Sequence, residues 1–137
     1  MAEQRLRRIA QVARYALALV FLWHGLVPKL LWPSPDELAM IMAHEPAAQV
    51  LVAPATLARF AGWAEVTLAL LLVTRPWRWP LLLAGLALLL LLVDVALFSP
   101  HLLIQAFNPV STNLAALALC LVAWLAEAPS SAPVQPQ

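Results

Sequence analysis

The chain has 137 residues, of which 64% are hydrophobic and only 11% are charged, whereas an ordinary soluble domain is roughly a quarter charged. This composition excludes a soluble globular domain and predicts an integral membrane protein in contact with the lipid bilayer. The net charge is only +1 and the basic residues form no extended stripe, so we expect no binding to nucleic acid.

Four apolar segments are each long enough to cross a bilayer, which takes about 20 helical residues. Short connections join them, so the sequence predicts an all-α membrane protein: a four-helix transmembrane bundle with a short extracytoplasmic helix between spans one and two. The predicted spans cover residues 15–31, 57–73, 79–98 and 109–125.

The basic residues predict the orientation of these spans. Four arginines precede the first span, and Arg75 and Arg78 lie between the second and the third. Because cytoplasmic connections are rich in Lys and Arg, we expect both termini in the cytoplasm, with the bacterial inner (plasma) membrane as the location. Residues 1–14 then form a basic cytoplasmic segment, residues 15–127 the membrane domain, and residues 128–137 a disordered tail rich in Pro and Ser.

Two local patterns predict helix starts. Ser34 and Pro35 suit the cap and the first position of a helix, and Glu37 would complete a capping box. This predicts a short helix that ends before Pro46, with its acids serving the helix start rather than a ligand. Asn108, which precedes a proline, has the same structural explanation at the start of the fourth span.

Several ionisable or polar side chains fall inside the spans, where a charge near the bilayer centre costs about 2.5–3.5 kcal/mol. Each therefore needs a partner or a cavity, and we expect them to converge on one polar pocket near the outer half of the membrane. The structural alternatives are that Lys29 and Arg59 extend their charges to the membrane surface (snorkelling) and that Glu65 forms an ion pair. The residues are His24, Lys29, Arg59, Glu65, Asp94, Ser111, Thr112 and Asn113.

Helical spacing places the polar groups on faces with small residues, which pack against other helices. Pro28 cannot donate to the carbonyl of His24, so a helix that continues this far would leave a free backbone acceptor beside the imidazole. Irregular backbone at that depth is best tolerated where it lines a cavity. The three predicted faces are Ala58, Gly62, Glu65 and Ala69; Ala84, Ala87, Leu91 and Asp94; and Asn113, Ala116 and Cys120.

Three blocks of this chain, residues 23–30 (WHGLVPKL), 62–66 (GWAEV) and 107–113 (FNPVSTN), resemble the signature blocks of DoxX-like membrane proteins. That family is similar to four-helix proteins that include a subunit of thiosulfate:quinone oxidoreductase. The resemblance implies a four-span fold and hints at quinone-linked redox work. It carries over His24, Lys29, Glu65, Asn108 and Asn113 as site residues. Some relatives carry paired cysteines, whereas this chain has only Cys120, so the resemblance does not extend to dithiol chemistry.

Three functions remain open. In the first, an accessory subunit without its own electron carrier binds a quinone through His24 and Lys29, Glu65 relays a proton, and a redox partner protein supplies electrons. Asp94, Asn108 and Asn113 complete this predicted ligand site, with Glu65 and His24 as its catalytic pair and no metal. The second is a small proton-coupled permease that works as a homo-oligomer. The third is a structural or assembly subunit whose charges form an ion-pair network.

Overall fold

The computed structural model describes residues 1–44 and 52–127. These residues form helices and no strand, and four of the helices are long and apolar enough to cross a membrane. The elements are α1 (Ala2–Gly25), a π-helical turn η1 (Leu26–Leu31), α2 (Pro35–Met42), α3 (Pro54–Thr74), α4 (Trp79–Phe98), a 3₁₀ turn η2 (Pro100–Ile104) and α5 (Pro109–Ala126).

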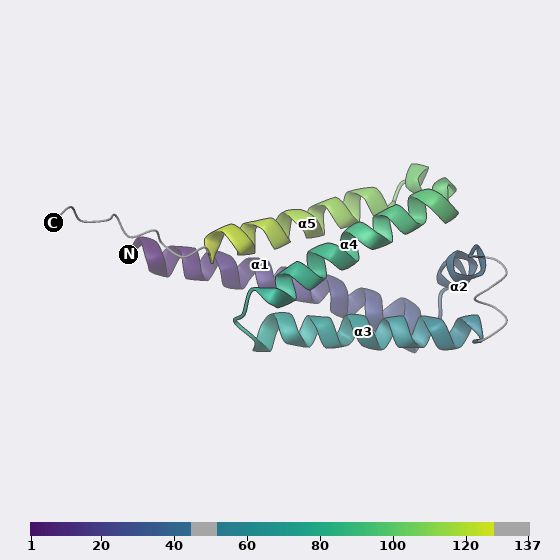
Figure 1. Cartoon of the computed structure of the whole chain (residues 1–137), viewed down its shortest axis with the longest axis horizontal. Helices are drawn as coiled ribbons and strands as arrows, with labels where there is room; N and C mark the ends of the chain where they lie inside the picture. Colours follow the sequence, from purple (N-terminus) through teal and green to yellow (C-terminus); the bar gives the residue numbers. More distant parts are fainter. Residues whose placement is uncertain (45–51, 128–137) are drawn as a thin grey trace.

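The long helices form the predicted four-span bundle. α1 packs against α3 and α5, and α4 packs against α5. Figure 1 shows α2 at the end of the bundle that is far from the N-terminus. We call this the α2 end, and we call the opposite end, where α1 begins and α5 finishes, the basic end.

The predicted span limits are close to the observed ones. The third span matches α4 at both ends, and the fourth differs from α5 by one residue. The first helix differs most, because it begins at Ala2 and continues through the arginines that were assigned to a separate basic segment. Exposed arginines favour helix almost as well as leucine does, so the change from polar to apolar composition does not end the helix. The tail 128–137 and its predicted disorder lie outside the described residues.

Two of the three predicted packing faces are buried. On α3, Ala58 and Ala69 are almost fully buried, and on α5, Ala116 and Cys120 are. The face on α4 is only half packed: Ala84 is buried, but Leu91 is exposed. That helix departs from α3 toward the α2 end (Figure 1), and Leu91 there lines a groove between the two helices.

Two arginines fasten the basic end. The guanidinium of Arg14 donates to both carboxylate oxygens of Glu127, with 2.9 Å between Nη2 and Oε2. It also donates to the backbone oxygens of Leu72, Arg75 and Trp77, carbonyls that follow or end α3 and lack helical donors. Arg78 lies 3.5 Å above the Trp124 ring and donates to that residue's carbonyl. α1, α3, α4 and α5 are therefore joined at this end by side chains.

The α2 end contains the predicted short helix, but its cap differs from the capping box. The Ser34 hydroxyl accepts from the Asp36 N–H at 3.2 Å, as expected. The Ser34 N–H, however, donates to the carbonyl of Pro28 at 2.8 Å. The Glu37 carboxylate therefore has no role in the cap and pairs with Lys29 instead. The helix ends at Met42, and Pro46 lies outside the described residues.

Candidate functional site

A buried ion-pair cluster lies where η1, α2 and α3 meet. The Lys29 ammonium is 2.9 and 3.1 Å from the two carboxylate oxygens of Glu65. It is also 3.2 Å from Oε1 of Glu37. The side chains of Lys29 and Glu65 are only 8% and 13% exposed. One cation is thus shared between two carboxylates, which we call the Lys29 cluster.

A close crossing of two glycines brings this cluster together. A Cβ built on Gly62 of α3 would lie 2.8 Å from the Gly25 oxygen of α1, and one built on Gly25 would lie 2.9 Å from Cβ of Glu65. Only hydrogen at both positions allows the two backbones to approach this closely. Glu65 and Lys29, one turn beyond the crossing on each helix, are therefore held within reach of each other.

The π-helical turn gives Lys29 its direction. Pro28 has no N–H to offer the carbonyl one turn earlier, and the chain continues with a wider turn in which the Trp32 N–H donates to the Val27 oxygen at 2.9 Å. Such turns are frequent at functional sites. Pro28 therefore lies where the α-helix has given way to the π-helical turn.

His24 lies near the cluster but is not part of its hydrogen-bond network. It is close enough for the charges of Lys29 and Glu37 to act on it. Its side chain is exposed on α1 and has no hydrogen-bond partner among the residues that the structure describes. A molecule beside α1 could therefore reach the imidazole.

A groove of about 430 Å³ runs between α3 and α4 beside the cluster. Its polar side chains are Glu65 and Asp94, and the rest of its lining is apolar, with a floor made by Phe21 of α1. The other lining residues are Ala61, Ala64, Leu68, Leu83, Ala87, Leu90 and Leu91. In Figure 1, α4 diverges from α3 along this stretch. Glu65 therefore contacts Lys29 and also lines an apolar groove.

Asp94 is linked to α2. Its Oδ1 lies 2.6 Å from Nε2 of His44, whose other ring nitrogen lies 2.9 Å from the Met40 carbonyl. The imidazole also lies against Phe98, with 4.2 Å between ring centroids. Both ring nitrogens face acceptors, and the hydrogen bond to Asp94 is the largest cause that raises the pKa of His44. α2 is thus connected to α3 through Glu37 and Lys29, and to α4 through His44.

The two predicted asparagines do not join the cluster. Asn108 caps α5, where its side-chain oxygen accepts from the Ser111 N–H at 3.0 Å. Asn113 donates to the Leu88 carbonyl of α4 at 3.3 Å. Arg59 is exposed near the start of α3. The polar groups of the four spans therefore do not converge on a single pocket: Glu65 and Asp94 line the groove, and Lys29 pairs with Glu65 beside it.

Sequence reasoning missed Glu37 and His44 as site residues. Glu37 carries a strong helix-start pattern that explains it locally, and it reaches Lys29 only because the chain turns between them, where the Ser34 N–H donates to the Pro28 carbonyl. His44 is separated from Asp94 by α3 and most of α4, so no spacing pattern joins them. In the described ranges 1–44 and 52–127, no group of three His, Cys, Asp or Glu side chains could hold a metal ion.

Comparison with known proteins gives one match. A family model described as the DoxX-like family matches residues 18–121, a range that contains the Lys29 cluster and the whole groove. No curated protein and no solved structure was found to match the chain.

Proposed function

Since the chain belongs to the DoxX-like family and has four helices fit to cross a membrane, we propose that it is an accessory subunit that binds a quinone in the groove between α3 and α4. Glu65 exchanges a proton with the quinone head. The observation that carries this proposal is the position of Glu65, which pairs with Lys29 and also lines the groove.

The shape and polarity of the groove support a quinone-like ligand. Ligand sites are usually largely apolar, with a few polar groups that orient the molecule. Leu68, Leu83 and Leu90 suit an isoprenoid or alkyl chain, and Glu65 and Asp94 suit the oxygens of the head. An ionised carboxylate accepts a hydrogen bond from a quinol hydroxyl, and a protonated one donates to a quinone carbonyl.

The charge balance of the Lys29 cluster supports proton exchange at Glu65. With both carboxylates ionised, the three side chains carry one net negative charge. When Glu65 takes up a proton, Lys29 and Glu37, 3.2 Å apart, remain as a neutral pair. A low-dielectric site penalises unbalanced charge, so this second carboxylate lets Glu65 take up a proton without leaving an unpaired ammonium.

Electrons come from a redox partner protein. Reduction of a quinone takes up two electrons and two protons, and Cys120, a single buried thiol, could not hold an iron–sulfur cluster. The chain then supplies the membrane site and one proton path, and its partner supplies the electron carrier.

The experiment is mass spectrometry of organic extracts from protein purified in mild detergent. Wild type is compared with Glu65→Gln and with a matched control, Glu37→Gln, which removes a carboxylate from Lys29 but does not line the groove. We expect a stoichiometric quinone in wild type and in Glu37→Gln, and its loss in Glu65→Gln. A lack of quinone in all three preparations would contradict the proposal.

The ion pairing itself favours a second candidate, a structural subunit. Lys29 has two carboxylate partners and low exposure, so the cluster could serve only to join η1, α2 and α3. In that case Glu65→Gln and Glu37→Gln both lower the thermal unfolding temperature and neither preparation contains a specific ligand. Substrate-dependent flux in liposomes would instead support a proton-coupled permease.

The proposed orientation places the basic end in the cytoplasm and the Lys29 cluster toward the outside of a bacterial inner membrane. Arg5, Arg7, Arg8 and Arg14 precede or begin the apolar part of α1, and Arg75 and Arg78 lie at the same end. Reporter fusions to the C-terminus and to the connection between α4 and α5 test this, since only the former should be active in the cytoplasm.

A further inference from the structure

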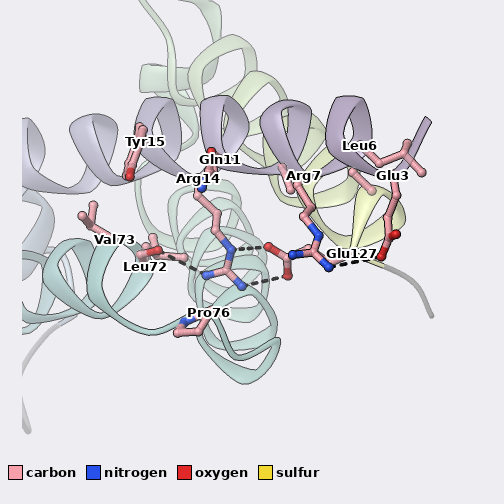
Figure 2. A pocket seen from close by; sticks show the side chains of 12 residues that line it. Glu3, Leu6, Arg7, Gln11, Arg14, Tyr15, Leu72, Val73, Pro76 and Glu127 are labelled. Atoms are coloured by element: carbon pink, nitrogen blue, oxygen red, sulfur yellow. Dashed lines mark hydrogen bonds and ion pairs between the residues drawn. The ribbon is translucent and has the colours of Figure 1, made fainter. Parts of the chain in front are cut away.

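The pocket in Figure 2 lies at the basic end, away from the Lys29 cluster. It has a volume of about 570 Å³ and is bounded by the first turns of α1, the end of α3 and the end of α5. We propose that this pocket binds the headgroup of an anionic phospholipid. The inference does not depend on the proposed quinone site.

Three hydrogen-bond donors line the pocket along one face of α1. Arg7, Gln11 and Tyr15 are spaced four residues apart, so they follow one another on the same side of the helix. Gln11 and Tyr15 are exposed, and neither has a hydrogen-bond partner within the described part of the chain. Figure 2 shows them in sequence along α1, with apolar residues of α3 nearby.

The two arginines of the pocket have different roles. All five N–H groups of Arg14 are accounted for by Glu127 and three backbone carbonyls, so Arg14 fixes the walls and cannot hold a ligand. Arg7 donates one bond, to Glu3 at 3.1 Å, and its side chain is 76% exposed. Its remaining N–H groups are free to form charge-assisted bonds to a phosphate.

The charge around the pocket favours an anion. Six of the seven arginines of the chain lie at this end, whereas its acidic residues there are Glu3 and Glu127. The excess of four positive charges attracts anionic lipids, by about fivefold in affinity for each Lys or Arg near the membrane surface.

The dimensions fit a phospholipid that lies along α1. Arg7 and Tyr15 are eight residues apart, which corresponds to about 12 Å along a helix. This length reaches from the phosphate, past the glycerol, to the first acyl carbons. There Leu72 and Val73 form the apolar wall. A free phosphate would use only Arg7, so the full row of donors favours a lipid.

The test is native mass spectrometry of the whole chain with phosphatidylglycerol and phosphatidylcholine of identical acyl chains. Three proteins are compared: wild type, Arg7→Gln, and Arg8→Gln as the matched control. Arg8 is exposed and lies next to Arg7, but it does not line the pocket. Both substitutions remove one positive charge from the same turn.

We expect wild type to retain phosphatidylglycerol in preference to phosphatidylcholine. Arg7→Gln should weaken this retention by about fiftyfold, because it loses both a surface charge and a charge-assisted bond, and Arg8→Gln by about fivefold, because it loses the charge alone. Tyr15→Phe, which removes only a hydroxyl, should also weaken retention. Circular dichroism should show equal helix content in all variants.

Three results would overturn the proposal. Equal losses in Arg7→Gln and Arg8→Gln would show diffuse attraction instead of a site. Equal retention of phosphatidylglycerol and phosphatidylcholine would show that the pocket does not prefer an anionic headgroup. Displacement of phosphatidylglycerol by millimolar inorganic phosphate, or occupation of the pocket by a co-purifying protein, would show that its ligand is not a lipid.

Discussion

Replacing Gly62 by alanine tests whether the close crossing of α1 and α3 holds the Lys29 cluster together. The new Cβ would lie 2.8 Å from the Gly25 oxygen, whereas ordinary contacts begin at 3.4 Å. The helices must therefore separate by about 0.6 Å, the difference between these distances, and overpacking of this kind costs about 1–3 kcal/mol. We expect the free energy of unfolding of Gly62→Ala to fall by that amount, less the gain of up to about 1 kcal/mol that alanine has over glycine in a helix, and Lys29 and Glu65 to move apart.

The matched control is Gly85→Ala in α4, because no atom lies within 4 Å of a Cβ built there. Alanine is favoured over glycine in a helix by up to about 1 kcal/mol, so this variant should be as stable as wild type or slightly more stable. Equilibrium unfolding in mixed detergent micelles, followed by tryptophan fluorescence, compares the two. If Gly62→Ala unfolds at the same denaturant fraction as Gly85→Ala, the crossing is looser than described and the reasoning is wrong.

Three more predictions concern the charged residues. Lys29→Met should lower the free energy of unfolding by about 3–5 kcal/mol because it leaves buried carboxylates without a cation. Adding Glu65→Gln should recover most of this loss in the same unfolding assay. If it recovers nothing, the two side chains are not coupled. Arg14→Gln should lower the free energy of unfolding by a similar ~3–5 kcal/mol in the same assay, since a residue only 5% exposed loses its ion pair. A loss below about 1 kcal/mol would contradict the view that Arg14 holds the helix ends together. The hydrogen bond to Asp94 raises the pKa of His44, so the stabilisation by this pair is complete at acidic pH and is lost as the pH rises through the raised pKa. Amide exchange of α2, corrected for its intrinsic pH dependence, should therefore increase at alkaline pH in wild type. Asp94→Asn should show no such step.

The elements that sequence predicted well depend on local signals. The limits of α4 follow from an unbroken apolar run, and the starts of α2 and α5 follow from Ser34 and Asn108, whose side chains accept the expected backbone bonds. These signals act within one turn of helix, so they do not depend on how the helices pack against one another. The family resemblance is confirmed for the same reason, since it depends on contiguous blocks.

The parts that sequence could not predict depend on how helices cross. A mid-span carboxylate requires a partner, but only the distance between α1 and α3 at Gly25 and Gly62 shows that the partner is Lys29. Likewise, no spacing along the sequence shows which side chains the acids of α2 and α4 pair with. The turn after η1 brings Glu37 to Lys29, and the position of α2 brings His44 to Asp94.

The bracing of Arg14 has a consequence for how the protein is inserted. Arg14 belongs to α1, which leaves the ribosome before α3, α4 and α5, whereas its carboxylate partner, Glu127, follows α5. Until α5 has entered the membrane, that guanidinium must stay hydrated at the lipid headgroups, because a charge is costly in the hydrocarbon. The first helix therefore cannot take its final depth and tilt before synthesis of the membrane domain is finished, and a chain truncated before α5 should be recognised as incomplete by quality-control proteases.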